Sequence, residues 1–322
     1  MEYIFGKNID IEGQINKHYS GVKKLLLCDR NLYSLYSQKI DSIASDILVL
    51  EPGERAKSKD SLFAVLELLM KKSYTRSDCI VSFGGGVIGD LGGLASSLYM
   101  RGMEHVIIAT SIIAMADSSI GGKTAINYNG IKNVFGTFYE PSIVIADTSF
   151  LKTLPDKEKK SGMGEILKVC LLSGHTELLH GDIDCAIEHA AQYKMKLVER
   201  DLLDKGQRHL LNFGHTMGHA VELEYGITHG EAVAMGIDFI CKLSDQIGIS
   251  NNLTTRVREI MQKFDFSLID SVKINENVLD RLYNDKKRES KSINLVMLED
   301  IGKPIIKAMA IDDIRKFALE NC

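Results

Sequence analysis

Several features that would assign this 322-residue sequence to a specialised class of protein are missing. Lys and Arg (39) do not outnumber Asp and Glu (43), so the net charge of −4 offers no general basic surface for nucleic acid. None of the six cysteines forms a C-x-x-C pair, which favours reduced thiols over a disulfide framework. The longest apolar run, 106–116, is too short to span a bilayer, and the N-terminus has no secretory signal pattern. We therefore expect a cytoplasmic protein that binds neither nucleic acid nor membrane.

The composition, 45% hydrophobic and 25% charged, is that of an ordinary globular protein of about two domains. Short apolar stretches typical of buried strands occur at 23–29, 46–51, 78–86, 105–110 and 142–147. A helical pattern at 58–73 lies between them, and strands separated by helices imply a parallel sheet.

The pattern changes near residue 155, after which it is mainly helical. A short hairpin is expected within 292–310 and a closing helix at 311–321. We predict an α/β domain with a parallel sheet over 1–155 and a mainly α-helical domain over 156–322.

A glycine-rich turn, FGGGVIGD at 83–90, matches G-x-G-x-x-G through Gly84, Gly86 and Gly89. Glycine lets backbone N–H groups approach a pyrophosphate at the start of a helix. The motif follows the third predicted strand, and no strand-end acid lies about 20 residues beyond it, although Asp29 ends an earlier strand. The turn is compatible with dinucleotide binding, but not with a standard Rossmann domain.

Two polar segments leave a structural and a functional interpretation open. Residues 115–136 carry Asp117, Lys123, Asn127, Lys132 and Asn133. A solvated loop would explain this segment as well as a binding site would. Glu165 and Lys168 stand one turn apart at the predicted start of a helix, which most often indicates a surface ion pair.

The stretch LLNFGHTMGHAVE at 210–222 places two histidines four residues apart. Helical spacing, of three or four residues, connects five polar side chains, which predicts one continuous helix face. They are Arg208, Asn212, His215, His219 and Glu222. Two histidines of a core helix would fit an isolated pair, whereas this polar face favours a metal or anion site. A third histidine, His229, and Glu165 complete a His-His-Glu set of the kind that binds catalytic zinc.

Five motifs, in this order, resemble those of 3-dehydroquinate synthase, a sugar-phosphate cyclase family. They are GGGVIGDLGGLASSLYMRG, DSSIGGKTAINYNGIKNVFGTFYEP, GEILK, RHLLNFGHTMGHAVE and HGEAVAMG. The similarity covers roughly residues 20–300 and implies an N-terminal NAD-binding domain followed by a helical metal domain. It implies a phosphate-eliminating lyase of the shikimate pathway, which leads to the aromatic amino acids.

The reaction that the resemblance implies converts 3-deoxy-D-arabino-heptulosonate 7-phosphate to 3-dehydroquinate and phosphate. NAD oxidises a ring hydroxyl, phosphate is eliminated, the hydride is returned, and the ring opens and closes by an aldol step. The phosphate dianion of the substrate can itself take the proton, so no separate base is required.

The resemblance also implies roles for individual residues. The zinc ligands would be Glu165, His215 and His229, with Co²⁺ also compatible, and His219 would contact substrate. The NAD contacts would be Asp29, Asn31, Glu54, Lys57, Gly85, Gly86, Val87, Asp90, Thr110, Ser111, Asp117 and Thr153. The substrate-binding or catalytic residues would be Arg101, Lys123, Lys132, Asn133, Lys168, Lys194, Arg208, Asn212, His219 and a lysine of the DKK run, assigned as Lys286 with Lys287 as the alternative. The arginine matching Arg101 reaches the neighbouring subunit's site in the family, which implies a homodimer.

Three alternatives differ in their chemistry. Another sugar-phosphate cyclase, making aminodehydroquinate, 2-deoxy-scyllo-inosose or epi-valiolone, would use the same NAD and metal. Lys194, Arg208 and Asn212 favour a carboxylated substrate, which the inosose and valiolone enzymes lack. A metal-dependent polyol dehydrogenase would release NADH and has no use for a phosphate pocket. An inactive NAD-binding protein is the least favoured, because no matched metal or phosphate residue is missing.

Overall fold

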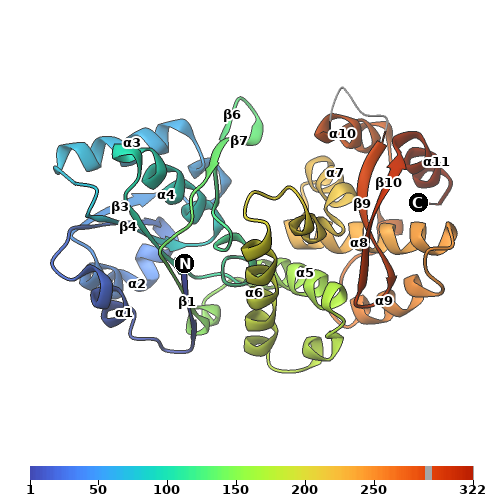
Figure 1. Ribbon diagram of the computed structural model, residues 1–322, viewed down its shortest axis with the longest axis horizontal. Helices are drawn as coiled ribbons and strands as arrows, with labels where there is room; N and C mark the ends of the chain where they lie inside the picture. Colours follow the sequence, from blue (N-terminus) through green and yellow to red (C-terminus); the bar gives the residue numbers. More distant parts are fainter. Residues whose placement is uncertain (287–291, 322) are drawn as a thin grey trace. The chain divides into compact units, whose positions relative to one another are not determined.

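The protein divides into two compact units (Figure 1). The computed structural model describes residues 1–286 and 292–321, without the side chains of 283–286. The first unit comprises Met1–Leu154 and Lys194–Leu203, and the second comprises Pro155–Tyr193 and Asp204–Cys322.

A six-stranded parallel sheet forms the centre of the first unit, as predicted. Its strand order is β1-β8-β5-β4-β2-β3. The bounds are β1 Glu2–Gly6, β2 Lys24–Asp29, β3 Asp46–Leu50, β4 Cys79–Gly84, β5 Glu104–Ala109 and β8 Ile143–Asp147. Strand β1 was not predicted, because its apolar run, 3–5, has only three residues, and none of its five residues is fully buried. It extends the sheet by pairing in parallel with β8.

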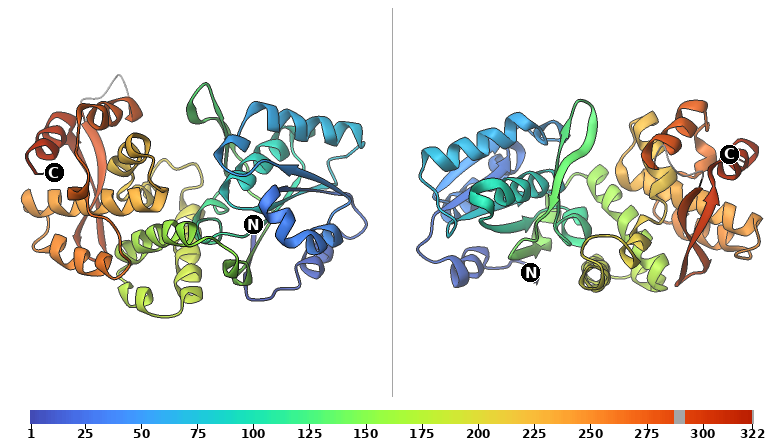
Figure 2. Two further views of the ribbon diagram at one scale, coloured as in Figure 1. Left: turned by 180° about the vertical axis from the view of Figure 1, so that it is seen from behind. Right: turned by 45° about the horizontal axis from the view of Figure 1, so that its top comes forward.

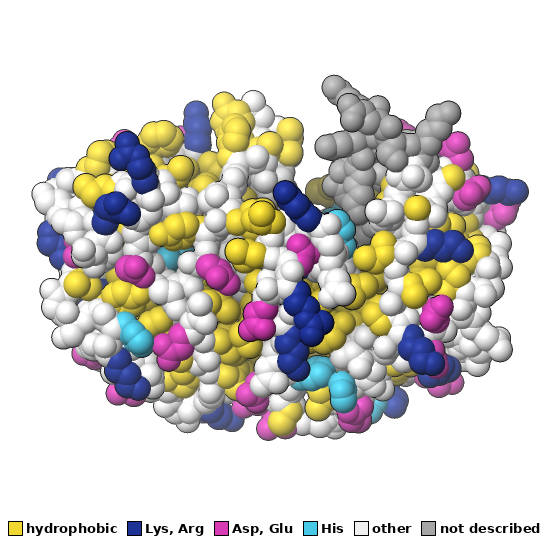
Figure 3. Space-filling model, in the orientation of Figure 1, with side chains coloured by type: hydrophobic (Ala, Val, Ile, Leu, Met, Phe, Trp, Pro, Cys, Tyr) yellow, Lys and Arg dark blue, Asp and Glu magenta, His cyan; other side chains and the backbone are white. Residues whose placement is uncertain are grey.

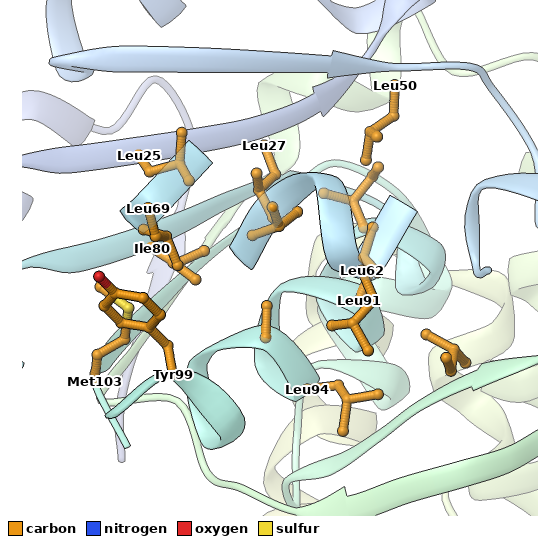
Figure 4. Close-up of a cluster of buried hydrophobic side chains, with 14 of the residues drawn as sticks. Leu25, Leu27, Leu50, Leu62, Leu69, Ile80, Leu91, Leu94, Tyr99 and Met103 are labelled. Atoms are coloured by element: carbon orange, nitrogen blue, oxygen red, sulfur yellow. The ribbon is translucent and has the colours of Figure 1, made fainter. Parts of the chain in front are cut away.

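Helices cover both faces of this sheet (Figures 1 and 2). They are α1 Ile11–Tyr19, α2 Arg30–Ile43, α3 Lys59–Lys71 and α4 Gly86–Leu98. The predicted helix at 58–73 is confirmed as α3, whose N-cap Ser58 accepts a hydrogen bond from the N–H of Ser61. A buried cluster from β2, β3, β4, α3 and α4, including Leu25, Leu27 and Leu91, joins α3 and α4 to one face (Figure 4).

An antiparallel hairpin occupies much of the polar segment 115–136. A π-helical turn, Ala114–Ser118, leads to β6 Lys123–Tyr128 and β7 Ile131–Phe138. Every residue of β7 is exposed, including Ile131 and Phe135, and hydrophobic side chains gather on this hairpin at the top of Figure 3. The sequence did not predict the hairpin, because its polar and glycine residues hide the alternation of a strand.

The second unit is mainly helical, as predicted. Its helices are α5 Asp156–Ser173, α7 His215–Tyr225, α8 His229–Gln246, α9 Leu253–Gln262, α10 Glu276–Lys286 and α11 Ile311–Asn321. Helix α6, Ile183–Arg200, begins in this unit, and its last turns belong to the first. The predicted hairpin and closing helix are confirmed as β9 Ser292–Asp300, β10 Lys303–Ala310 and α11. Within the described part of the chain, none of the helices has the length and apolar character needed to cross a bilayer.

The continuous helix face predicted through Arg208 and Glu222 is wrong. Residues Gln207–Asn212 form a short 3-10 helix, η6, and α7 begins only at His215. Gly214 separates the two helices with a φ of +77°, a left-handed conformation that glycine adopts without steric cost. Arg208 and Asn212 therefore belong to a different element from His215 and His219.

Glycines allow the backbones of α5, α7 and α8 to touch. A Cβ at Gly164 of α5 would overlap the carbonyl oxygen of Gly230 in α8, and a Cβ at Gly236 would overlap the carbonyl oxygen of Gly214. Each contact lies beside a residue that the sequence assigned to a metal site. The close approach of the three helices therefore decides the geometry of that site.

The contact between α5 and α8 predicts the effect of one added methyl group. Gly164→Ala should lower the free energy of unfolding by about 1–3 kcal/mol, because the backbone of α8 cannot move aside cheaply. The control is Gly89→Ala in α4, where the new Cβ would meet only Ile107 Cδ1 at 3.7 Å. This variant should be neutral or stabilised by up to about 1 kcal/mol, the helix propensity gain of alanine. Urea unfolding followed by circular dichroism measures both, and equal stability of the two variants would refute the contact.

Candidate active site

Three side chains from three helices converge at the glycine contacts. Nε2 of His229 donates to Oε1 of Glu165 at 3.0 Å, and Nε2 of His215 lies 3.5 Å from the same oxygen. One ligand atom from each residue lies within 4.8 Å of the others, which is a geometry suited to a metal ion. Each of the three side chains is next in sequence to a glycine of a helix contact: Glu165 to Gly164, His215 to Gly214 and His229 to Gly230. The helix contacts therefore place the three candidate ligands.

The carboxylate of Glu165 is buried at 1% exposure and pairs with the ammonium of Lys168, which is equally buried. Burial alone would raise the pKa of Glu165, but Lys168, His215 and His229 hold it well below the usual range. The pair expected at the surface is therefore an internal one, which supplies an ionised oxygen ligand.

The two histidines differ in their surroundings. Burial lowers the pKa of His215 to about 3, helped by the nearby charge of Lys168, so its imidazole is neutral. Burial would also lower the pKa of His229, but the hydrogen bonds to Glu165 and Glu222 raise it to about 10. A metal ion at this site would take the place of a proton on His229, since a ligand nitrogen must be unprotonated.

Glu222 has a role that the sequence did not identify. Its Oε2 accepts a hydrogen bond from Nδ1 of His229 at 2.9 Å, which directs Nε2 toward Glu165. A carboxylate behind a ligating histidine fixes its tautomer and orientation in metal sites. The sequence did not reveal this hydrogen bond, because Glu222 and His229 are seven residues apart and lie on different helices, α7 and α8.

His219 offers a second arrangement of ligands. Its ring centroid lies 5.2 Å from that of His215, and it forms a set with Glu222 and His229 in which one atom from each lies within 4.8 Å of the others. Both sets include His229, so one metal ion cannot be bound by each set at once. The Nδ1 atom of His229 already donates a hydrogen bond to Glu222. The set built on buried Glu165 therefore has the better chemistry for a metal. His219 is exposed, whereas Glu165 is buried.

Two more predicted substrate residues lie in the same unit as these histidines. Arg208 is buried at 2% exposure and Asn212 is half-buried, and both belong to η6. Lys286 ends α10, but its side chain lies outside the described ones, as does the whole of Lys287.

In the first unit, the glycine turn lies where the strand order reverses. The connection from β2 leads to β3 on one side, and that from β4 leads to β5 on the other. Ligands of open parallel sheets bind outside the carboxyl ends of the strands at this point. Asp29 ends β2, Gly85 caps the start of α4 after β4, and Thr110 follows β5. The predicted nucleotide contacts from these segments therefore lie at one edge of the sheet.

Polar contacts join several predicted residues of the first unit. Nζ of buried Lys57 donates to Oδ2 of Asp90 at 2.6 Å and to Oδ1 of Asn133. Burial raises the pKa of Asp90, and the charge of Lys57 opposes this shift. Lys194 donates to the carbonyl oxygen of Asp117 at 2.6 Å and to its Oδ1 at 2.9 Å.

The remaining predicted residues of this unit are exposed or partly exposed. They are Asn31, Glu54, Val87, Arg101, Ser111, Lys123, Lys132 and Thr153. Oε1 of Glu54 accepts from Asn127, and the hydroxyls of Thr153 and Tyr36 bond each other at 2.6 Å. Met100 and Arg101 have φ values of 48° and 67°, an unusual left-handed pair that presents Arg101 on the surface.

Comparison with known proteins identifies relatives over most of the chain. Residues 47–161 match the family model for 3-dehydroquinate synthase N-terminal, and 144–288 match that for 3-dehydroquinate synthase C-terminal. The chain is 38% identical to the 3-dehydroquinate synthase of Clostridium acetobutylicum, over 96% of this chain and 92% of the relative. It is 39% identical to that of Leuconostoc citreum, over 92% and 88% of the two chains.

Solved structures share the fold at lower sequence identity. A 2-deoxy-scyllo-inosose synthase complexed with carbaglucose-6-phosphate, NAD+ and Co2+ matches with a TM-score of 0.87 at 22% identity. A 2-epi-5-epi-valiolone synthase from Streptomyces hygroscopicus, with NAD+ and Zn2+ bound, matches with a TM-score of 0.86 at 24% identity. Each match covers 99% of this chain and 96% of the other. These structures confirm the predicted fold class.

The bond between Glu222 and His229 predicts a change in metal affinity. Glu222→Gln keeps the shape of the side chain but loses the charge that orients His229, so a bound divalent ion should be held about 10- to 100-fold less tightly. Glu224→Gln is the control on the same helix, because Glu224 binds Asn275, Asn277 and Arg281 instead. Competition with a chromogenic chelator measures both affinities, and an unchanged affinity in Glu222→Gln would contradict the orienting role.

Proposed function

The chain belongs to the 3-dehydroquinate synthase family, and we propose that its own residues convert 3-deoxy-D-arabino-heptulosonate 7-phosphate to 3-dehydroquinate and phosphate. It is an enzyme of the lyase class, acting by phosphate elimination. The observation that carries the proposal for the site is the convergence of Glu165, His215 and His229 within 4.8 Å beside a buried ammonium. We also propose that the protein is located in the cytoplasm, as its cysteine pattern predicts.

We assign a divalent metal to Glu165, His215 and His229, with Glu222 orienting His229. One carboxylate and two imidazoles match the preferences of Zn²⁺, and Co²⁺ accepts the same donors. Zinc is the assignment we favour. NAD is assigned to the carboxyl ends of β2, β4 and β5, where Asp29, Gly85 and Thr110 lie. When bound, NAD supplies reversible hydride transfer, and the metal supplies Lewis-acid polarisation of the hydroxyl that is oxidised.

The substrate is held by residues whose charges match its two anionic groups. Arg208 presents a planar fork for the carboxylate, where paired charge-assisted hydrogen bonds are strong. Exposed His219 donates to the phosphate, and Lys123, Lys132 and Lys194 add positive charge. Asn133, Asn212 and Lys168 complete the set, and a lysine of the DKK run joins it from α10. The phosphate itself carries away the proton, so these residues bind and orient rather than act as a base.

A homodimer is the proposed assembly. Arg101 stands exposed at the end of a strained left-handed turn, which directs it away from the core of its own unit. We assign it to the active site of a second copy of the chain.

The reaction stoichiometry separates a cyclase from a polyol dehydrogenase. With the heptulosonate phosphate, catalytic NAD and a divalent metal, the protein should release one phosphate per product without net NADH, because the hydride is returned. His219→Ala should slow phosphate release and leave the metal content unchanged. The control is His180→Ala, an exposed histidine outside the site.

Phosphate detection and absorbance at the NADH wavelength measure both products in one assay. Stoichiometric NADH without phosphate would place the protein among the dehydrogenases. Loss of metal from the His219→Ala variant would overturn its assignment to substrate.

The proposed bond between the Arg208 guanidinium and the substrate carboxylate predicts a second kinetic effect. Arg208→Lys keeps the charge but loses the paired geometry, so transition-state binding should weaken by about 1–3 kcal/mol, judged from kcat/KM. Arg256→Lys is the control, since Arg256 pairs with Asp300 at the surface. Unchanged catalytic efficiency in Arg208→Ala would show that the carboxylate is bound elsewhere. It would also favour a cyclase with an uncharged sugar phosphate.

A further inference from the structure

A buried histidine of the central sheet has no place in the function proposed above. His105 of β5 is 1% exposed, and its Nε2 shares a hydrogen bond of 2.9 Å with Oγ of Ser82 on the neighbouring strand β4. Burial lowers the pKa of His105 to about 3, so the ring is neutral. A neutral imidazole has one N–H donor and one acceptor nitrogen, and each needs a partner in the protein interior.

The second nitrogen of this ring faces a small cavity. Within the described residues, neither Nδ1 of His105 nor Oγ of Ser118 has a hydrogen-bond partner, although both atoms are buried. Both residues line the same cavity of about 10 Å³, together with Asp90, Lys123 and Thr124. Two unpaired polar atoms thus border one small space that is lined by α4 and by the segment that leads into β6.

Glycines of α4 leave room for polar side chains near this cavity. A Cβ at Gly92 would overlap Oγ of Ser82, and one at Gly93 would overlap the methyl group of Thr124. A Cβ at Gly86 would come within 3.0 Å of Oγ of Ser118. Three glycines on one helix therefore make room for the polar groups around the cavity.

The size and lining of the cavity fit a single water molecule. A space of about 10–15 Å³, measured for a water-sized sphere, holds one water when two to four polar partners surround it. Water can donate to or accept from Nδ1, whichever tautomer the bond to Ser82 selects, and the Ser118 hydroxyl is equally adaptable. A bridging water would also offset the cost of burying two unpaired polar atoms.

We propose that this cavity binds one ordered water between His105 Nδ1 and Ser118 Oγ, and that His105 is thereby a positioning residue for the segment 117–123. This segment carries Asp117, which holds Lys194, and it ends at Lys123. The bridge supports the segment from behind, on the side of the sheet. The kinetic consequence rests on the proposed role of Lys123, whereas the water site does not.

A crystal structure of the NAD- and zinc-loaded protein at about 1.5 Å tests the water site directly. We expect one water peak within hydrogen-bond distance of both Nδ1 of His105 and Oγ of Ser118. A dry cavity would overturn the proposal, as would a direct bond between the two side chains. A protein with this water but no phosphate release would contradict the proposed function and leave the site intact.

Two amide variants separate the two nitrogens of the ring. The amide of His105→Asn places a polar atom where Nδ1 stands, and that of His105→Gln places one where Nε2 stands. His105→Asn should keep the water and stay within about threefold of the wild-type kcat/KM. His105→Gln should keep the bond to Ser82, lose the water, and lose about tenfold in kcat, as expected for a misplaced substrate residue.

Equal losses in the two variants would show that His105 acts only through packing or Ser82, and no loss in either would exclude positioning. If either variant fails to fold, Ser118→Ala supplies the same test from the other end of the bridge. It should fold normally, lose or displace the water, and lower kcat about three- to tenfold. Wild-type kcat with the water absent would overturn the positioning role.

Discussion

The backbone contact between Gly164 and Gly230 is the constraint on which the candidate active site depends. It brings α5 and α8 closer than any side chain would permit, and the residues beside the two glycines, Glu165 and His229, meet as a result. The contact between Gly214 and Gly236 adds His215 in the same way. Helices hold all three candidate ligands, which limits their movement more than loops would.

The buried negative charge where α5, α7 and α8 meet requires a cation. Glu165 is an ionised carboxylate with almost no access to water, and such a group is costly unless it is paired. Lys168 supplies one positive charge. A proton on His229 or a metal ion supplies a second, which balances Glu222 behind His229. The same carboxylate therefore needs positively charged partners inside the second unit, and its ionised oxygen is one that a divalent ion could bind.

The strands of the central sheet, helix α3 and the β9–β10 hairpin were predictable because their apolar periodicity and caps are local signals. Strand β1 was not, since it forms by pairing with β8, and its residues are not fully buried. Packing against α8 explains the helix break at Gly214 and the burial of Glu165 with Lys168. The spacing of residues along the chain carries no information about this packing. The role of Glu222 was hidden for the same reason. The motifs indicated the candidate ligand residues, and tertiary contacts supplied their geometry.

We propose that the crossing of α5, α7 and α8 builds one metal site. Anomalous diffraction from crystals of the zinc-loaded protein, collected on both sides of the zinc absorption edge, tests it most directly. We expect a single strong peak at bonding distance, about 2.0–2.2 Å, from a carboxylate oxygen of Glu165 and from Nε2 of His215 and of His229. A peak bound by His219 and Glu222 without Glu165, or no peak at the crossing, would contradict it.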